Sequence, residues 1–329
     1  MKAKGVEDRN FIVYDGRSVL TIIGKRVSRM NWLQAALLSA GVMGVVNVID
    51  SHLLTRRMPS LRAYLVPVGI LHLIFSLILF FLFPLPKDIG WLPLVVAFGS
   101  SIIRSAAILN MLYIMTRVEV SRVIPVVHTY PIFVALMAVL LLGESLVPLQ
   151  WFAIFVVVAG AVLVSLRHSL TSANIQLGRS FGLLLTSSLL IAGADVASKF
   201  ALNYISFWNM YYIGAIGMSV SFLILSVRRS VLEELRSMPQ RNSALALMTF
   251  NEILAPVGIV LSFWAIQRGP VSLVSTILST RPIFVFIYAL VLGRVLPMFL
   301  EWRPTRGILV LRLVAIAMIV GGIAIIQLL

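Results

Sequence analysis

The sequence predicts an all-α, polytopic membrane protein with ten transmembrane helices arranged as two inverted five-helix repeats. Three observations support this: an apolar composition, many long apolar runs and a duplicated pattern. Of the 329 residues, 60% are hydrophobic and 12% are charged, whereas soluble domains are typically about 45–50% apolar and about 25% charged. The composition therefore excludes an ordinary soluble domain.

Ten apolar runs follow one another along the chain. Each can cross about 30 Å of hydrocarbon at about 1.5 Å per residue. We expect helices because the runs are about twice the length of a barrel strand and do not alternate apolar with polar residues. The runs lie near residues 32–54, 63–83, 91–115, 120–142, 149–167, 181–203, 207–227, 244–266, 271–292 and 310–328.

The second half of the chain repeats the first at an offset of 151 residues, so that "PIFV" from Pro131 recurs from Pro282. We therefore predict a basic tail over 1–31, a first repeat over 32–167, a connector over 168–180 and a second repeat over 181–329. An odd number of helices inverts the second repeat, a plan that recurs in secondary transporters with a substrate site between the repeats. A duplication that only enlarged the bundle is the alternative.

Pro131 and Pro282 occupy equivalent positions inside apolar runs. A proline within a helix removes one backbone hydrogen bond, which leaves the carbonyls of Val127 and Leu278 without their helical partners. In a membrane such breaks are tolerated mainly where another part of the protein satisfies the backbone or where it lines a cavity. Two matching breaks predict one shared cavity; two ordinary kinks are the alternative.

Six ionisable side chains other than histidine lie within the apolar runs: Asp50, Arg104, Asp195, Lys199, Glu252 and Arg281. A charge that faced lipid near a helix centre would cost about 2.5–3.5 kcal/mol, so we expect these groups to be paired or hydrated. Counting along the helices places Arg104, Glu252 and His128 about 20 Å from the side of the N-terminus, with Arg281 and Tyr130 at about 15–18 Å. The sequence thus predicts a polar belt across the membrane interior.

The pairing of these groups is open in the sequence. Arg104 and Glu252 lie on equivalent helices of the two repeats, which predicts an ion pair between the repeats. Asp195 and Lys199 are four residues apart and are predicted to satisfy each other. Asp50 and Lys199 also lie near helix ends, from which they can reach the headgroups. Arg281 has no acid on its own helix, and its planar guanidinium suits a carboxylate or phosphate of a substrate.

The predicted substrate contacts are Arg281, Arg104, Glu252, His128, Tyr130, Thr280 and Asn110. The predicted coupling or gating residues are Glu252, Asp195, Pro131 and Pro282. A carboxyl in a low-dielectric medium retains a proton readily, which is why Glu252 and Asp195 are candidates for coupling. Ser, Thr and Asn side chains in membranes also serve as helix-packing contacts, which is the alternative for Thr280 and Asn110.

Each half resembles an EamA-type unit of the drug/metabolite transporter superfamily. The resemblance covers about residues 32–328 and is carried by the Pro-Ile-Phe helix, "LLLGESL" from Leu140 and "VVVAGAVLVSL" from Val156. It implies a ten-helix carrier of small metabolites. In the second unit, Arg294 stands at the counterpart of Glu144, and "RVLPMFLEWRPTRG" from Arg294 is longer than its first-half partner.

Enzyme motifs are absent from the sequence. It has no cysteine, no GxGxxG, GxxxxGK or HExxH spacing, and its four histidines form no ligand set. We therefore expect no enzyme, no catalytic residue, no metal site and no cofactor, with transport driven by a gradient.

The net charge of +15 is scattered over the tail and the short loops. This pattern favours anionic lipid headgroups over nucleic acid as a partner, and the sequence is compatible with a homodimer. The arginine-rich loops on the side away from the termini favour external termini, whereas the basic tail and the resemblance favour cytoplasmic ones. We expect a multi-pass protein of the cytoplasmic membrane.

The sequence as a whole predicts a secondary active transporter that works by alternating access on a small polar or amphoteric metabolite, such as an exported amino acid. One alternative is a flippase for a lipid-linked sugar or a phospholipid, which would need a lateral opening between helices. The other is a membrane scaffold or sensor that transports nothing.

Overall fold

The computed structural model describes residues 30–86, 89–115, 126–165, 179–295 and 306–329. The chain divides into two units, Met1–Asn31 and Trp32–Leu329, and the second contains the helices. In the first half, the described elements are α2 (Trp32–His52), the π-helical turn η1 (Leu53–Arg57), α3 (Leu61–Leu82), α4 (Trp91–Met115), α6 (Tyr130–Met137), the π-helical turn η2 (Ala138–Leu142) and α7 (Pro148–Ser165).

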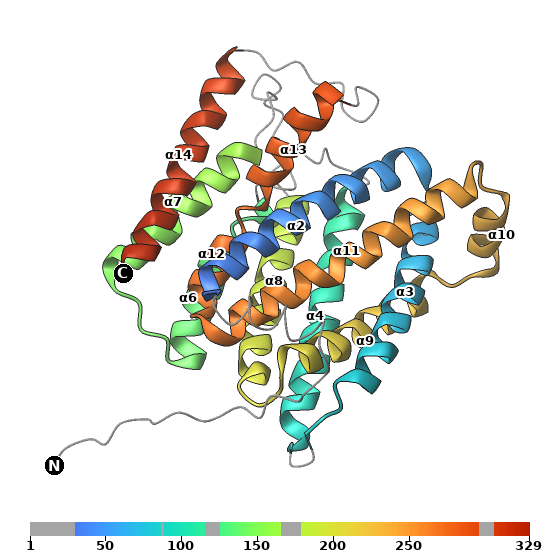
Figure 1. Cartoon of the computed structure of the whole chain (residues 1–329), viewed down its shortest axis with the longest axis horizontal. Helices are drawn as coiled ribbons and strands as arrows, with labels where there is room; N and C mark the ends of the chain where they lie inside the picture. Colours follow the sequence, from blue (N-terminus) through green and yellow to red (C-terminus); the bar gives the residue numbers. More distant parts are fainter. Residues whose placement is uncertain (1–29, 87–88, 116–125, 166–178, 296–305) are drawn as a thin grey trace. The chain divides into compact units, whose positions relative to one another are not determined.

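The second half contains α8 (Arg179–Leu202), α9 (Phe207–Ser226), α10 (Arg229–Ser237), α11 (Arg241–Arg268), α12 (Val271–Leu278), α13 (Arg281–Val295) and α14 (Arg306–Leu328). The described ranges contain helices and no strand, which confirms the all-α prediction (Figure 1). The segment 120–129 at the start of the fourth predicted helix lies partly outside the described residues.

Eight helical segments are long and apolar enough to cross a membrane, and two shorter apolar helices, Tyr130–Leu142 and Pro148–Val164, complete the set. The ten predicted runs therefore all correspond to apolar helices, although the two shorter ones do not reach spanning length within the described residues. α10 was not predicted. It is short and amphipathic, with only Val231 buried, so a search for long apolar runs cannot find it.

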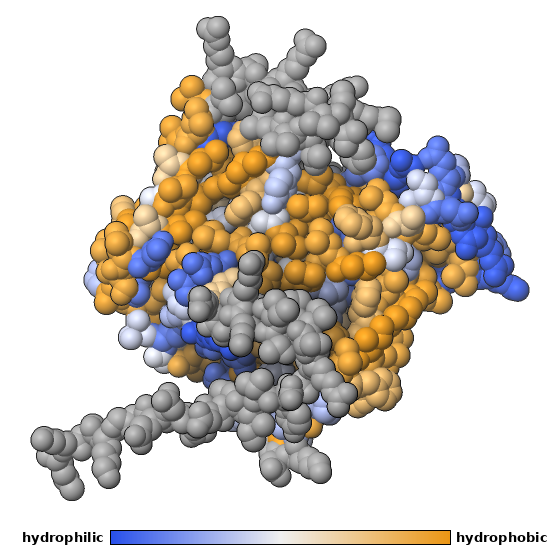
Figure 2. Space-filling model, viewed as in Figure 1, coloured by the Kyte–Doolittle hydropathy of each residue, from blue (hydrophilic) through white to orange (hydrophobic). Residues whose placement is uncertain are grey.

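Apolar side chains cover much of the visible surface of the helices (Figure 2). Phe81, Trp91, Leu140 and Ile224 are each more than 70% exposed. In water such exposure would oppose folding, whereas hydrocarbon is as apolar as these side chains. The surface therefore fits a protein embedded in a bilayer.

The helices of the two halves pack in reciprocal pairs. The first helix of one half packs on the third of the other, as α2 on α11 and α8 on α4. The second helices, α3 and α9, pack on each other, as do the fifth helices, α7 and α14 (Figure 1). This reciprocity is the pattern expected of two repeats related by a pseudo-two-fold axis.

Small residues let these pairs approach closely. A Cβ on Gly217 of α9 would lie 1.9 Å from Ser101 Oγ of α4, and a Cβ on Gly160 of α7 would lie 2.9 Å from the carbonyl oxygen of Ala315 in α14. Ser219 Oγ donates a 2.6 Å hydrogen bond to Gly69 O, which joins α9 to α3. Close backbone approach of this kind drives helix association in lipid.

Candidate substrate site at the helix breaks

The two proline-containing segments are interrupted in the same way. In the first half, Thr129 N donates to Val126 O at 3.2 Å and Ile132 N donates to Thr129 O at 3.1 Å. In the second half, Thr280 N donates to Ile277 O at 3.0 Å and Ile283 N donates to Thr280 O at 2.9 Å. The pattern of tight i to i−3 bonds thus recurs at an offset of 151 residues.

Pro131 and Pro282 lie in the first turns of α6 and α13. A proline is tolerated there because its missing N–H would have no helical partner at that position. The freed carbonyl of Val127 accepts a 3.5 Å hydrogen bond from Ser188 Oγ, which also donates to Val126 O at 3.0 Å. A neighbouring helix therefore satisfies the first break, as membrane helices require.

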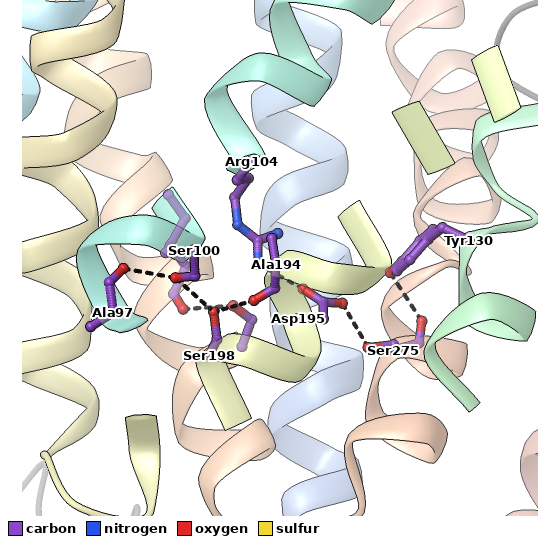
Figure 3. Close-up of polar contacts among 10 residues, drawn as sticks. Ala97, Ser100, Arg104, Tyr130, Ala194, Asp195, Ser198 and Ser275 are labelled. Atoms are coloured by element: carbon purple, nitrogen blue, oxygen red, sulfur yellow. Dashed lines mark hydrogen bonds and ion pairs between the residues drawn. The ribbon is translucent and has the colours of Figure 1, made fainter. Parts of the chain in front are cut away.

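The two breaks meet each other. α6 packs on α12, and Tyr130 Oη donates a 3.1 Å hydrogen bond to the carbonyl oxygen of Ser275, one turn before the second break (Figure 3). Tyr130 is 8% exposed. This hydrogen bond joins the first break to the helix that precedes the second break, between residues 145 positions apart in the chain.

Asp195 on α8 collects polar contacts from both halves. Its Oδ1 accepts a 2.7 Å hydrogen bond from Arg104 Nη2 on α4, and its Oδ2 accepts a 2.7 Å bond from Ser275 Oγ on α12 (Figure 3). The Asp195 side chain is 5% exposed and that of Arg104 is 25% exposed. The chain Arg104–Asp195–Ser275–Tyr130 links four helices around the breaks.

Both sequence-based pairings of these charges are wrong. Arg104 pairs with Asp195, not with Glu252. Lys199 does not pair with Asp195: its Nζ donates to the carbonyl oxygens of Ile266 at 2.7 Å and Gly269 at 2.9 Å, at the end of α11. Counting residues along each helix predicts how deep a charged group lies in the membrane. It gives no information on which helices are neighbours, so it cannot predict the partner of that group.

Arg281 and His128 lie at the second and first break. Arg281 Nε and His128 Nδ1 are buried and have no hydrogen-bond partner among the described residues. An unsatisfied buried polar group costs about 1–3 kcal/mol, and more when the group is charged. Such groups are rare in folded proteins, so these two point to a ligand or water that completes the site.

Two predicted contacts have structural partners. Asn110 Nδ2 donates to Leu183 O at 2.7 Å and to Ser187 Oγ at 2.8 Å, which fastens α4 to α8. Thr280 Oγ1 donates to Ile277 O at 2.7 Å, which holds the turn at the second break. Asn110 therefore makes a contact between helices, whereas the bond of Thr280 lies within its own segment. Their predicted contacts with substrate stay predictions.

Glu252 belongs to another cluster. Its Oε2 lies 3.4 Å from His72 Nε2. Asp50 was expected to reach the lipid headgroups, but its partners are other side chains of the protein. Tyr64 Oη and Asn251 Nδ2 each donate a 2.6 Å hydrogen bond to Asp50 Oδ1. His72 was not singled out from the sequence, although a lone ionisable residue inside an apolar run marks a candidate functional group.

No group of three or more His, Cys, Asp or Glu side chains that could hold a metal ion occurs within the described residues. The half-helix N-termini of α6 and α13 add partial positive charge at the breaks.

Long apolar helices with a polar interior and two interrupted segments define a multi-pass membrane protein built on the plan of a transporter. Residues 30–166 match the EamA-like transporter family. This match confirms the resemblance found in the sequence over the first half of the chain, which is similar to an EamA-like unit.

One solved structure, described only as "Crystal structure of protein", is similar to this chain with a TM-score of 0.60 and 17% identity. The alignment covers 90% of this chain and 95% of that one, so the likeness extends over both halves. At this identity the likeness concerns the fold. A comparison with curated proteins gives no match.

Proposed function

We propose that this protein is a secondary active transporter that binds a small polar or amphoteric metabolite between its two repeats, 32–167 and 181–329, and works by alternating access. One observation carries the proposal: the two interrupted segments meet through Tyr130 and Ser275, beside buried polar atoms of Arg281 and His128 that have no partner among the described residues.

The charges at the breaks favour an anionic group on the substrate. Arg281 presents a guanidinium, which binds carboxylate and phosphate through paired hydrogen bonds. The N-termini of α6 and α13 begin at Tyr130 and Arg281, and helix N-termini favour negative charge. A metabolite carboxylate beside Arg281 would satisfy the unpaired Nε.

Contacts between the repeats supply the moving parts of the mechanism. Arg104–Asp195 and Tyr130–Ser275 each join one repeat to the other. Opening of the site toward one side of the membrane requires such contacts to break while others form. We propose these residues as the gate and the breaks at Pro131 and Pro282 as its hinges, in a carrier of the cytoplasmic membrane.

The test is substrate flux with the full-length protein in proteoliposomes. A panel of labelled amino acids and other small carboxylates is measured beside a fluorescent phospholipid and a lipid-linked sugar. Wild-type protein should move at least one small metabolite. Arg281→Gln should reduce that flux about tenfold or more, since a charge-assisted hydrogen bond contributes about 1.5–3 kcal/mol, and Arg281→Lys should retain part of it.

Arg236→Gln, on the exposed face of α10, is the matched control and should transport like the wild type. Movement of lipids without movement of small metabolites would replace the proposal by a flippase. No flux of any compound, with Arg281→Gln behaving like the wild type in cells, would replace it by a scaffold or sensor.

A further inference from the structure

A second polar cluster joins the two halves away from the helix breaks. It is formed where α11 packs on α2, α3 and α9 (Figure 1). Its members are ionisable or amide side chains, and most of them are buried: Asp50, Tyr64, His72, Tyr211, Asn251 and Glu252. We call these six residues the acid cluster.

The contacts in the acid cluster are short but incomplete. Asp50 Oδ1 accepts from Tyr64 and Asn251, each at 2.6 Å. Glu252 Oε2 lies 3.4 Å from His72 Nε2, with side-chain exposures of 4% and 7%. Asp50 is close enough to Glu252 for their negative charges to repel each other.

Several polar atoms in the acid cluster lack a hydrogen-bond partner among the described residues. They are both ring nitrogens of His72, Tyr211 Oη, Asn251 Oδ1 and Glu252 Oε2. The His72 and Glu252 atoms are within ion-pair distance, yet neither makes a hydrogen bond of good geometry. A buried site that leaves both a base and an acid unsatisfied is poised to take up or release a proton.

Two equivalent helix contacts in the two halves carry different charges. The contact of α4 with α8 and the contact of α11 with α2 are equivalent, since each joins the third helix of one half to the first of the other. At the first contact, Arg104 faces Asp195 and the charges cancel. At the second, Glu252 stands on the third helix and Asp50 on the first, so two acids occupy the interface.

Two neighbouring carboxylates in a low-dielectric medium do not both ionise. We propose that the acid cluster binds a proton, held between Glu252 Oε2 and His72 Nε2, in place of the positive charge that Arg104 supplies at the equivalent contact. This inference rests on the proposed transport function and names the ion that drives it. Binding of the proton forms an O–H bond at Glu252 Oε2, which faces His72 Nε2, and release of the proton breaks that bond; no other bond changes.

The groups that face Glu252 come from three helices packed against α11. α2 contributes Asp50, α3 contributes Tyr64 and His72, and α9 contributes Tyr211. Other charged groups near α11 bond elsewhere. Lys199 of α8 donates to the carbonyl oxygen of Ile266 at the end of α11, and Arg57 of η1 donates to the side chain of Gln240, the residue before α11. Glu234 of α10 accepts a hydrogen bond from Ser60. α12 carries no ionisable residue.

The position of the acid cluster connects proton binding to transport. α2 and α3 belong to the first half and α9 and α11 to the second, so the charge of the cluster acts across the surface between the halves. When the proton leaves, Asp50 and Glu252 repel each other. A ligand that binds one arrangement of two halves better than another shifts the population between them.

Direct detection of the proton is the first test. Full-length protein in lipid nanodiscs is titrated with pH, and infrared difference spectra record the C=O stretch of protonated carboxyl groups. We expect a titrating signal in the wild type that is lost in Glu252→Gln and weakened in Asp50→Asn. The matched control Glu233→Gln, on exposed α10, should keep the signal. This reading needs no substrate, so it is independent of the proposed function.

Coupling is the second test. In proteoliposomes with a substrate found by the flux screen, an imposed pH gradient should drive accumulation by the wild type. Glu252→Gln should exchange substrate between equal concentrations while accumulation in response to the pH gradient is lost. An unchanged infrared signal in both Glu252→Gln and Asp50→Asn would overturn the proposal, as would full pH-driven accumulation by Glu252→Gln.

Discussion

Arg104 on α4 donates a 2.7 Å hydrogen bond to Asp195 on α8, and this ion pair joins the third helix of the first half to the first helix of the second. Asp195 is also bound by Ser275 Oγ from α12 at 2.7 Å. Ser100 and Ser198 continue the polar contact between α4 and α8 at 3.4 Å (Figure 3). We therefore expect the Arg104–Asp195 ion pair to stabilise the protein, in addition to its proposed role in the gate.

Removal of either partner should destabilise the protein more than removal of both. Arg104→Gln leaves the buried carboxylate of Asp195 without its counter-ion, and Asp195→Asn leaves a guanidinium unpaired. Breaking a buried pair in this way costs about 3–5 kcal/mol, whereas neutral replacement of both partners costs much less. Thermal unfolding in detergent should show the double variant to be more stable than each single variant.

The control substitutions are Glu233→Gln and Arg236→Gln, at two exposed positions of α10. They should leave the unfolding temperature unchanged, singly and together. Strictly additive losses in the Arg104 and Asp195 variants would contradict a direct interaction between the two side chains.

Helix positions could be predicted well from the sequence because lipid imposes a simple rule. A span must be long, apolar and internally hydrogen-bonded, and the predicted run 91–115 coincides with α4 (Trp91–Met115). α10 was not predicted because it is nine residues long and amphipathic. The internal repeat also predicted that the breaks at Pro131 and Pro282 would match, which the backbone hydrogen bonds confirm.

Partners of the buried charges could not be predicted in the same way. The depth of Arg104, Asp195 and Glu252 is predicted by counting along each helix, but the neighbour of a helix face depends on how the helices pack. Arg104 and Glu252 are predicted to lie at similar depth, but the structure gives each another partner: Asp195 for Arg104 and His72 for Glu252.

Gly322 and Gly321 of α14 offer a test of helix packing with adjacent residues. A Cβ on Gly322 would lie 2.5 Å from Val157 Cγ2 and 3.2 Å from Ala153 O on α7, whereas a Cβ on Gly321 meets nothing within 4 Å. Gly322→Val should therefore force α7 and α14 apart at a cost of about 1–3 kcal/mol.

Gly321→Val should leave the unfolding temperature in detergent close to that of the wild type, because its side chain enters open space. Similar losses in the two variants would show that helix propensity, not packing on α7, decides the effect.

Glu144 stabilises the N-terminus of α12 from the opposite half of the protein. Its carboxylate accepts hydrogen bonds from Val271 N at 2.6 Å, Ser272 N at 3.3 Å and Ser272 Oγ at 2.5 Å. Negative charge at a helix N-terminus contributes up to about 2 kcal/mol when partly buried. Glu144→Gln should lower stability by about 1–2 kcal/mol on this basis and speed amide exchange in Val271–Leu278.

Ser272→Ala removes one of the three bonds to Glu144 and keeps the charge at the helix end. Its effect on hydrogen exchange, read by mass spectrometry, should be smaller than that of Glu144→Gln. Equal exchange in wild type and Glu144→Gln would mean that the first turn of α12 is held by its packing alone.

Lys199 and Gln267 tie the ends of α8 and α11 together reciprocally. Lys199 Nζ donates to Ile266 O at 2.7 Å and to Gly269 O at 2.9 Å, and Gln267 Nε2 donates to Leu202 O at 3.0 Å and to Ile205 O at 3.1 Å. Each side chain thus satisfies carbonyls that a helix end leaves without partners.

Lys199→Met keeps the length of the side chain and removes its donors, so the carbonyls at the end of α11 lose their charged partner. We expect a loss of about 1–3 kcal/mol, the cost of leaving such a hydrogen bond unmade, measured as a lower unfolding temperature in detergent. Gln267→Met should give a smaller loss because its amide is uncharged. If Lys199 instead extended to the headgroups, Lys199→Met would leave stability unchanged or raise it, since the exposed stem would then gain contact with lipid.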